Sequence, residues 1–93
     1  MATTTLIEVS FRCACVAKGV DVRAAVRAVA HGEPALSSNG GRTEHEGRVR
    51  VPAATADEAT AVLREAIENA ASAAGTSCEV MILSTRPVTG ARS

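Results

Sequence analysis

Three cysteines and one histidine form the first group of residues that could do chemistry. Cys13 and Cys15 are two residues apart, while His45 and Cys78 stand much farther along the chain. Three thiolates and an imidazole are a known zinc-ligand set, but this spacing matches no standard zinc motif. Residues two apart on a strand lie about 6.5–7 Å apart, a poor distance for a chelate or a disulfide. We therefore interpret the thiols as small core residues, with zinc or thiol chemistry as an alternative.

Three arginines form the second group, namely Arg12, Arg48 and Arg50. Guanidinium groups bind phosphate and carboxylate groups bidentately, so arginines on neighbouring strands would suit an anionic small molecule. Glutamates occupy the same face of the expected strands. The simpler interpretation is a solvated face of cross-strand ion pairs, each worth about 1 kcal/mol or less. The sequence leaves both interpretations open.

Histidine is a frequent general base, and His45 stands between Glu44 and Glu46. Alternation along a strand turns adjacent side chains to opposite faces, so neither carboxylate is expected to face the imidazole. The sequence contains no nucleophile elbow and no glycine-rich phosphate loop. No catalytic constellation is visible, and His45 is the proton carrier only if the protein is an enzyme. No cofactor is expected.

The composition is that of a small soluble domain with few large core residues. The 93 residues are 46% hydrophobic and 22% charged, with Phe11 as the single aromatic and a net charge of zero. Zero charge and missing aromatics argue against a dedicated nucleic-acid binder. There is no apolar run of about 20 residues for a membrane span and no signal-peptide pattern. Three cysteines are too few, and odd in number, for a disulfide framework. We therefore expect the protein to be located in the reducing cytoplasm.

Alanine and valine dominate the apolar residues, which predicts a thin core. Small domains with thin cores usually gain support from disulfides, a metal or oligomerisation. Because the first two are poorly supported by the cysteine pattern, we expect a second subunit.

Periodicity divides the chain into six elements. A period of two indicates strands, and a period of 3.6 bounded by caps indicates helices. The expected elements are a strand over 6–16, a helix over 21–31, a short strand before an Asn39-Gly40 hairpin, a strand over 42–51 in which Gly47 could mark a bulge, a helix over 55–74 and a strand over 77–86.

This order is that of an α+β fold, the ferredoxin-like split βαβ plait, in which two halves repeat strand–helix–strand. The expected sheet is antiparallel with strand order 4-1-3-2 and both helices on one face. We expect a single domain over 1–87 and a flexible tail over 88–93. Residues expected to face the helices are Ile7, Val9, Phe11, Cys13, Cys15, Val49, Val51, Cys78, Val80 and Ile82. Residues expected on the open face are Leu6, Glu8, Ser10, Arg12, Arg48, Arg50, Glu79, Met81 and Leu83.

Fold alone implies no function. The sequence favours a small cytoplasmic interaction or ligand-binding module that acts as a homodimer, another homo-oligomer or an accessory subunit. The interface would use Leu6, Met81 and Leu83, and the partner would be a protein or an anionic small molecule held by the three arginines. One alternative is a small dimeric enzyme acting on an acidic small molecule. The other is a thiol or zinc-binding protein using the three cysteines and His45.

Overall fold

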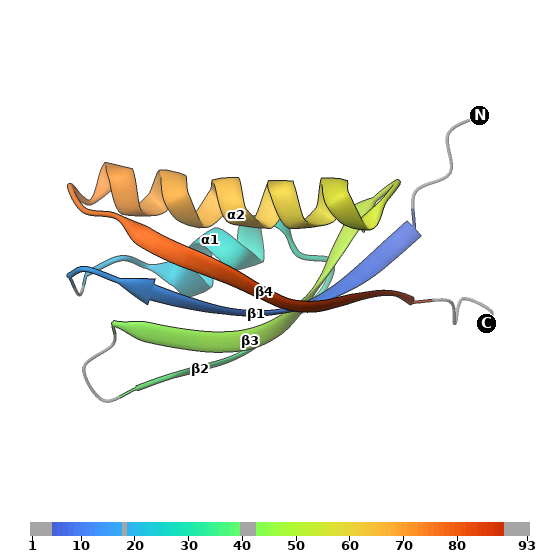
Figure 1. The fold of residues 1–93 in the computed structure, drawn as a ribbon, viewed down its shortest axis with the longest axis horizontal. Coiled ribbons are helices and arrows are strands. Elements are labelled where there is room, and N and C mark those ends of the chain that lie inside the picture. The colour runs from blue at the N-terminus through green and yellow to red at the C-terminus, as the bar shows by residue number, and fades with distance from the viewer. Residues whose placement is uncertain (1–4, 18, 40–42, 89–93) are drawn as a thin grey trace.

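The computed structural model describes residues 5–17, 19–39 and 43–88. It contains all six expected elements (Figure 1), with ends that differ from the expected ones by a few residues. Their bounds are β1 Thr5–Cys15, α1 Val22–Val29, β2 Ala35–Ser38, β3 Glu44–Ala53, α2 Ala56–Ala73 and β4 Cys78–Val88.

The four strands form one antiparallel sheet in the order β2-β3-β1-β4, and both helices lie on the same side of it (Figure 1). Counted from the other edge, this order has the same neighbours as the 4-1-3-2 order expected above. The expected plait of two matching halves has to be corrected. The α1 helix has 8 residues, packs mainly on α2 and meets the sheet chiefly at β3. The α2 helix has 18 residues and covers β1, β3 and β4.

The pairing of β1 with β4 contains an irregularity that the sequence did not reveal. Phe11 pairs with Ile82 while Ser10 pairs with Ser84, so Leu83 is an extra residue in β4. The bulge considered at Gly47 is absent, because this residue keeps a regular register with β1 and β2.

The β4 strand also runs farther than expected. It passes through Pro87 to Val88, which pairs with Leu6. An edge strand tolerates a proline because one of its sides has no ladder to interrupt. The remainder of the expected tail, 89–93, and the glycine of the Asn39-Gly40 turn lie outside the described residues.

Both helix starts follow from their capping residues. The Asp21 carboxylate accepts a hydrogen bond from the Ala24 amide at 3.0 Å, and the Thr55 hydroxyl accepts one from the Glu58 amide at 3.1 Å. Each bond satisfies an amide that has no partner inside its helix. The Glu58 carboxylate reaches back to the amide of Ala54, one residue before the position expected for a capping box.

The core lies between the sheet and the helices. Most residues expected to face the helices are buried, with Cys78 and Ile82 only partly so. Leu63 and Ile67 of α2 and Val9 and Phe11 of β1 are fully buried members of this core. In the described part of the chain, no helix has the length and apolar character needed to cross a membrane.

Candidate functional site

A buried histidine lies at one end of the core. His45, near the start of β3, pairs directly with Cys13 on β1, and both side chains are buried. Its Nδ1 atom is 2.7 Å from the hydroxyl of Ser38 on β2, a hydrogen bond whose donor depends on the imidazole tautomer. Its Nε2 atom is also buried and has no hydrogen-bond partner among the described residues.

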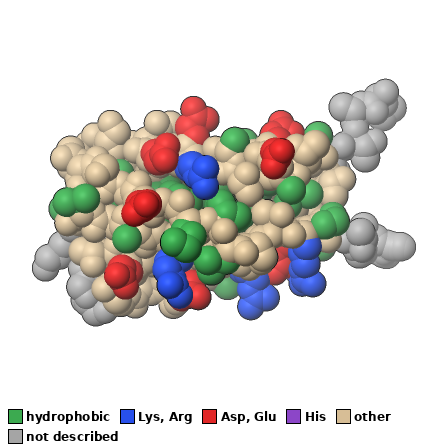
Figure 2. All heavy atoms as spheres, viewed as in Figure 1, with side chains coloured by type: hydrophobic (Ala, Val, Ile, Leu, Met, Phe, Trp, Pro, Cys, Tyr) green, Lys and Arg blue, Asp and Glu red, His purple; other side chains and the backbone are tan. Residues whose placement is uncertain are grey.

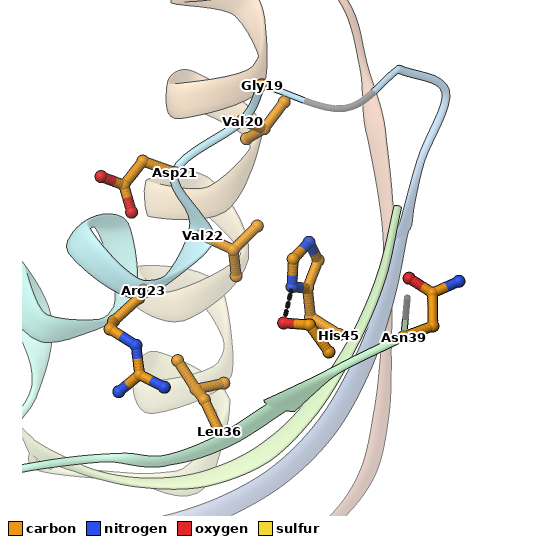
Figure 3. A pocket seen from close by; sticks show the side chains of 9 residues that line it. Gly19, Val20, Asp21, Val22, Arg23, Leu36, Asn39 and His45 are labelled. Carbon is orange, nitrogen blue, oxygen red and sulfur yellow. Dashed lines mark hydrogen bonds between the residues drawn. The ribbon is translucent and has the colours of Figure 1, made fainter. Parts of the chain in front are cut away.

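A cavity of about 790 Å³ adjoins this histidine (Figure 3). The turn before α1 and the first residues of α1 form one wall, and β2 and β3 form the other. The lining residues are Gly19, Val20, Asp21, Val22, Arg23, Leu36, Ser38, Asn39 and His45. Apolar walls with a few polar groups are typical of small-molecule sites.

Sequence reasoning singled out His45 but missed Ser38 and Arg23 as its companions. The signal for Ser38 was available, because a hairpin closing near Asn39 pairs the residues on either side of the turn. Ser38 and His45 are such a pair. Arg23 could not be found in this way, because its place in the cavity depends on how α1 packs over the sheet.

The three cysteines do gather at one end of the sheet, but two of them are bonded to each other. Cys15 and Cys78 pair directly across β1 and β4 and form a disulfide. The expectation that no disulfide forms is therefore corrected. Cys13 remains free, and burial raises the pKa of its thiol to about 11. In the described part of the chain, no three potential metal ligands come together.

The other face of the sheet carries the three predicted arginines, each in its own setting. Arg12 contacts Glu46 at 3.6 Å, and Arg48 contacts Glu8 at 3.4 Å. Arg50 is exposed and stands opposite Glu8 in the strand register. Arginine side chains gather along the lower edge of the view in Figure 2, on the side of the sheet away from the helices.

Glu8 is buried at only 8% exposure although it lies on this open face. Its carboxylate accepts hydrogen bonds from Arg86 at 3.1 Å and from Arg48 at 3.4 Å. The hydrogen bonds from Arg86 outweigh the effect of burial and lower the pKa of Glu8. The long arginine side chains thus both cover this carboxylate and hold it ionised.

The two ends of the open face carry opposite excess charge, one basic and one acidic, which we call the reversed charge pattern. Around Glu8 stand three arginines, two directly opposite it on the flanking strands and one diagonal to it: Arg50, Arg86 and Arg48. Around Arg12 stand three glutamates, one directly opposite and two beside the next outward position of β1: Glu46, Glu44 and Glu79. Ser10 lies between Glu8 and Arg12, so the excess charge changes sign along β1 near this serine.

The structure does not bring all of the predicted site residues together. His45 faces the helices, whereas Arg12, Arg48 and Arg50 point from the opposite face of the sheet. The predicted interface residues lie on the open face or at its edge, with Met81 56% and Leu83 47% exposed and Leu6 partly buried. The fold therefore contains two separate candidate sites, the His45 cavity and the open face.

Comparison with known proteins identifies no relative: no family model matches the chain, and no significant match occurs among curated proteins or solved structures.

Proposed function

We propose that the protein is a small interaction module that acts as a homodimer, with the open faces of two sheets packed against each other. The observation that supports this proposal best is the reversed charge pattern along the open face. A surface with one basic end and one acidic end complements a second copy of itself when that copy is turned end to end.

The arrangement of the charges selects one orientation. A two-fold axis in the plane of the interface, perpendicular to the strands, places β3 over the partner's β3 with the opposite direction. Arg50 then faces the partner's Glu44, and Arg86 of β4 faces the partner's Glu79. A two-fold axis along the strands would instead superpose the basic ends, which like-charge repulsion disfavours.

Exposed apolar side chains near the middle of this face would supply the desolvated part of the contact. Met81 and Leu83 are exposed on β4, beside the point where the charge changes sign. Burying such side chains contributes about 1.5–3 kcal/mol each when complete. The charged ends would set orientation and association rate more than affinity.

A charge-reversal pair tests this orientation. Arg50→Glu and Glu44→Arg should each weaken the dimer at least tenfold in sedimentation equilibrium, because each places like charges together twice per dimer. The double variant should restore the wild-type dissociation constant. Within one chain these positions lie six residues apart on a strand, roughly 20 Å, so direct intrachain pairing cannot explain the rescue.

Two controls accompany this pair. Arg64→Glu reverses an exposed charge on α2 and should leave the dimer unchanged. Met81→Asp combined with Leu83→Asp should give a monomer. Two results would contradict the proposal. One is a wild-type protein that stays monomeric at all concentrations. The other is a protein with both Arg50→Glu and Glu44→Arg that dimerises no better than the single variants.

The cytoplasmic location expected from the sequence remains a prediction, and the Cys15–Cys78 disulfide argues against it. Disulfides persist in oxidising compartments and are rare in the cytosol. Lysing cells directly in denaturant that contains iodoacetamide, and counting the alkylated thiols by mass spectrometry, separates the cases. One reactive thiol would indicate the oxidised protein and three would indicate the reduced one.

We do not propose the alternative of an enzyme in which Arg12, Arg48 and Arg50 orient a substrate for His45. The sheet itself separates the imidazole from these guanidinium groups. The zinc alternative is not proposed either, because the disulfide takes two of its three thiols.

A further inference from the structure

We propose that the cavity beside His45 binds a small organic anion through its carboxylate or phosphate group. This site lies on the helix side of the sheet, away from the proposed dimer interface, so it can be tested independently of the dimer. Three features of the cavity support the proposal: an unsatisfied buried nitrogen, a positive helix end with a nearby guanidinium, and apolar walls.

The buried nitrogen is the first feature. His45 is 8% exposed, and its Nε2 atom has no partner among the described residues. Figure 3 shows this nitrogen on the side of the ring that faces Val20, opposite the nitrogen that makes the hydrogen bond. A buried polar atom without a partner destabilises the protein, and a ligand that supplies the missing partner removes that cost.

The positive character of the opposite wall is the second feature. The cavity touches the first turn of α1, where the helix dipole favours anions. The amides of Val22 and Ala24 already donate to Val20 and Asp21, so the dipole rather than free amides supplies the positive character. Arg23 lines the same wall, and Figure 3 shows its guanidinium beside Leu36. Glu33 lies 3.9 Å from Arg23 but 2.7 Å from Arg27, so Arg27 is its close partner and Arg23 keeps donors for a ligand.

One acidic group lies at the site and has to be accounted for. The Asp21 carboxylate accepts a hydrogen bond from the Ala24 amide. In Figure 3 this carboxylate points away from His45. Asp21 lines the cavity, so the anionic group of the ligand is expected on the His45 side, away from this carboxylate.

The walls and the volume indicate what the anion is attached to. Val20, Val22 and Leu36 line the cavity between the polar groups. A volume of about 790 Å³ is large enough for a metabolite and exceeds what an inorganic ion needs. The ligand class is therefore an organic anion with an apolar portion.

Anion binding requires a particular state of the imidazole. The Ser38 hydroxyl must donate to Nδ1, or Nδ1 must also be protonated, so that Nε2–H donates to the ligand. Imidazole ¹⁵N NMR shifts report which nitrogens carry protons. An Nε2 found without a proton would overturn the proposal, because a bare lone pair repels an anion.

Titration of the wild-type protein with sodium butyrate and with sodium phosphate, each against sodium chloride at equal ionic strength, provides the binding test. We expect saturable shifts of the His45 ring and Arg23 signals, with the organic anion binding more tightly. A phosphate-only response would overturn the apolar part of the proposal. Shifts at exposed arginines with an unchanged His45 ring would overturn the site.

A pair of arginine variants separates the site from general charge effects. Arg23→Gln should weaken butyrate binding roughly tenfold, the loss expected for one charge-assisted hydrogen bond. Arg64→Gln removes the same charge from α2, outside the cavity lining, and should change the affinity less than twofold. Both arginines are exposed, so both variants should fold. Equal effects in the two variants would contradict the proposed site.

Discussion

Glu8 and Arg86 stand 78 residues apart in the chain and directly opposite each other on β1 and β4. The guanidinium donates from Nε and from a terminal nitrogen to the same carboxylate oxygen, at 3.3 and 3.1 Å. This pair joins the first strand of the fold to the last. It also forms the centre of the basic end of the open face.

The lowered pKa of Glu8 predicts a loss of stability in acid. The pKa of its carboxyl is lower in the folded protein than the ordinary value of 4.5, which applies to the unfolded chain. The contribution to folding is therefore complete above that pH and is lost as the pH falls through the lowered pKa. Urea unfolding at several pH values should show wild-type protein more stable than Glu8→Gln at pH 7, with a smaller difference at pH 3.

The control for this measurement is Glu65→Gln, which changes an exposed glutamate of α2. This variant should follow the wild-type pH profile. If the difference in unfolding free energy between wild type and Glu8→Gln does not change with pH, the Glu8–Arg86 pair acts through packing rather than through charge.

The disulfide between Cys15 and Cys78 predicts a large effect of reduction on stability. The bond closes a loop with a sequence separation of 63. In the entropic model, closing a loop of this size raises the free energy of the unfolded chain by about 4 kcal/mol. Measured contributions of disulfides to stability are typically 2–4 kcal/mol. Guanidinium unfolding with and without reductant should reveal a difference in this range. The Cys15→Ala, Cys78→Ala variant should match the reduced protein and lose its response to reductant.

The elements could be predicted from the sequence because their signals are local. Alternating residues of β1 and β3 define which side chains enter the core, and the Asp21 and Thr55 caps define where the helices begin. These signals act over a few residues, where backbone geometry leaves little choice.

The disulfide could not be predicted because it depends on a register set elsewhere. If the pairing of Ser10 with Ser84 continued without interruption, Cys15 would stand opposite Glu79. The extra residue at Leu83 moves the register by one position and brings Cys78 opposite Cys15. Nothing in the local pattern indicates where a bulge interrupts an edge strand.

The burial of Glu8 and the cavity beside His45 escaped prediction for a similar reason. Glu8 is covered by an arginine from the far end of the chain, and the cavity forms only where α1 meets β2 and β3. Strand alternation assigns a side chain to a face but does not say which long side chains will lie over it.

The close packing around Gly47 predicts that any side chain at this position destabilises the protein. A Cβ atom at this position would overlap the carbonyl oxygen of Ala35 and the side chain of Leu36, because β2 approaches β3 closely there. The carbonyl belongs to the backbone and cannot move without separating the strands. Gly47→Ala should lower the free energy of unfolding by about 1–3 kcal/mol, as overpacking does. Thermal unfolding monitored by circular dichroism would measure the change.

The control is Ser10→Ala in the neighbouring strand, which removes atoms and adds none. It should shift the midpoint much less. Because β2 has only four residues, local loss of this edge strand is the expected consequence of crowding at Gly47. Hydrogen exchange should then increase at Leu36 and Ser38 before it increases in β1.

The burial of Cys13 predicts that its thiol is unreactive in the folded protein and that ionisation of this thiol destabilises the fold at high pH. It is buried, and its pKa is raised from 9.0 to about 11 because the thiolate is poorly solvated there. Its contribution to stability is present below pH 9 and is lost as the pH rises toward 11, since the unfolded chain ionises first. Iodoacetamide at pH 8 should modify no thiol in the oxidised native protein and one after denaturation. The Cys13→Ala variant should lack this part of the alkaline destabilisation, and rapid labelling of native protein would contradict the burial of this thiol.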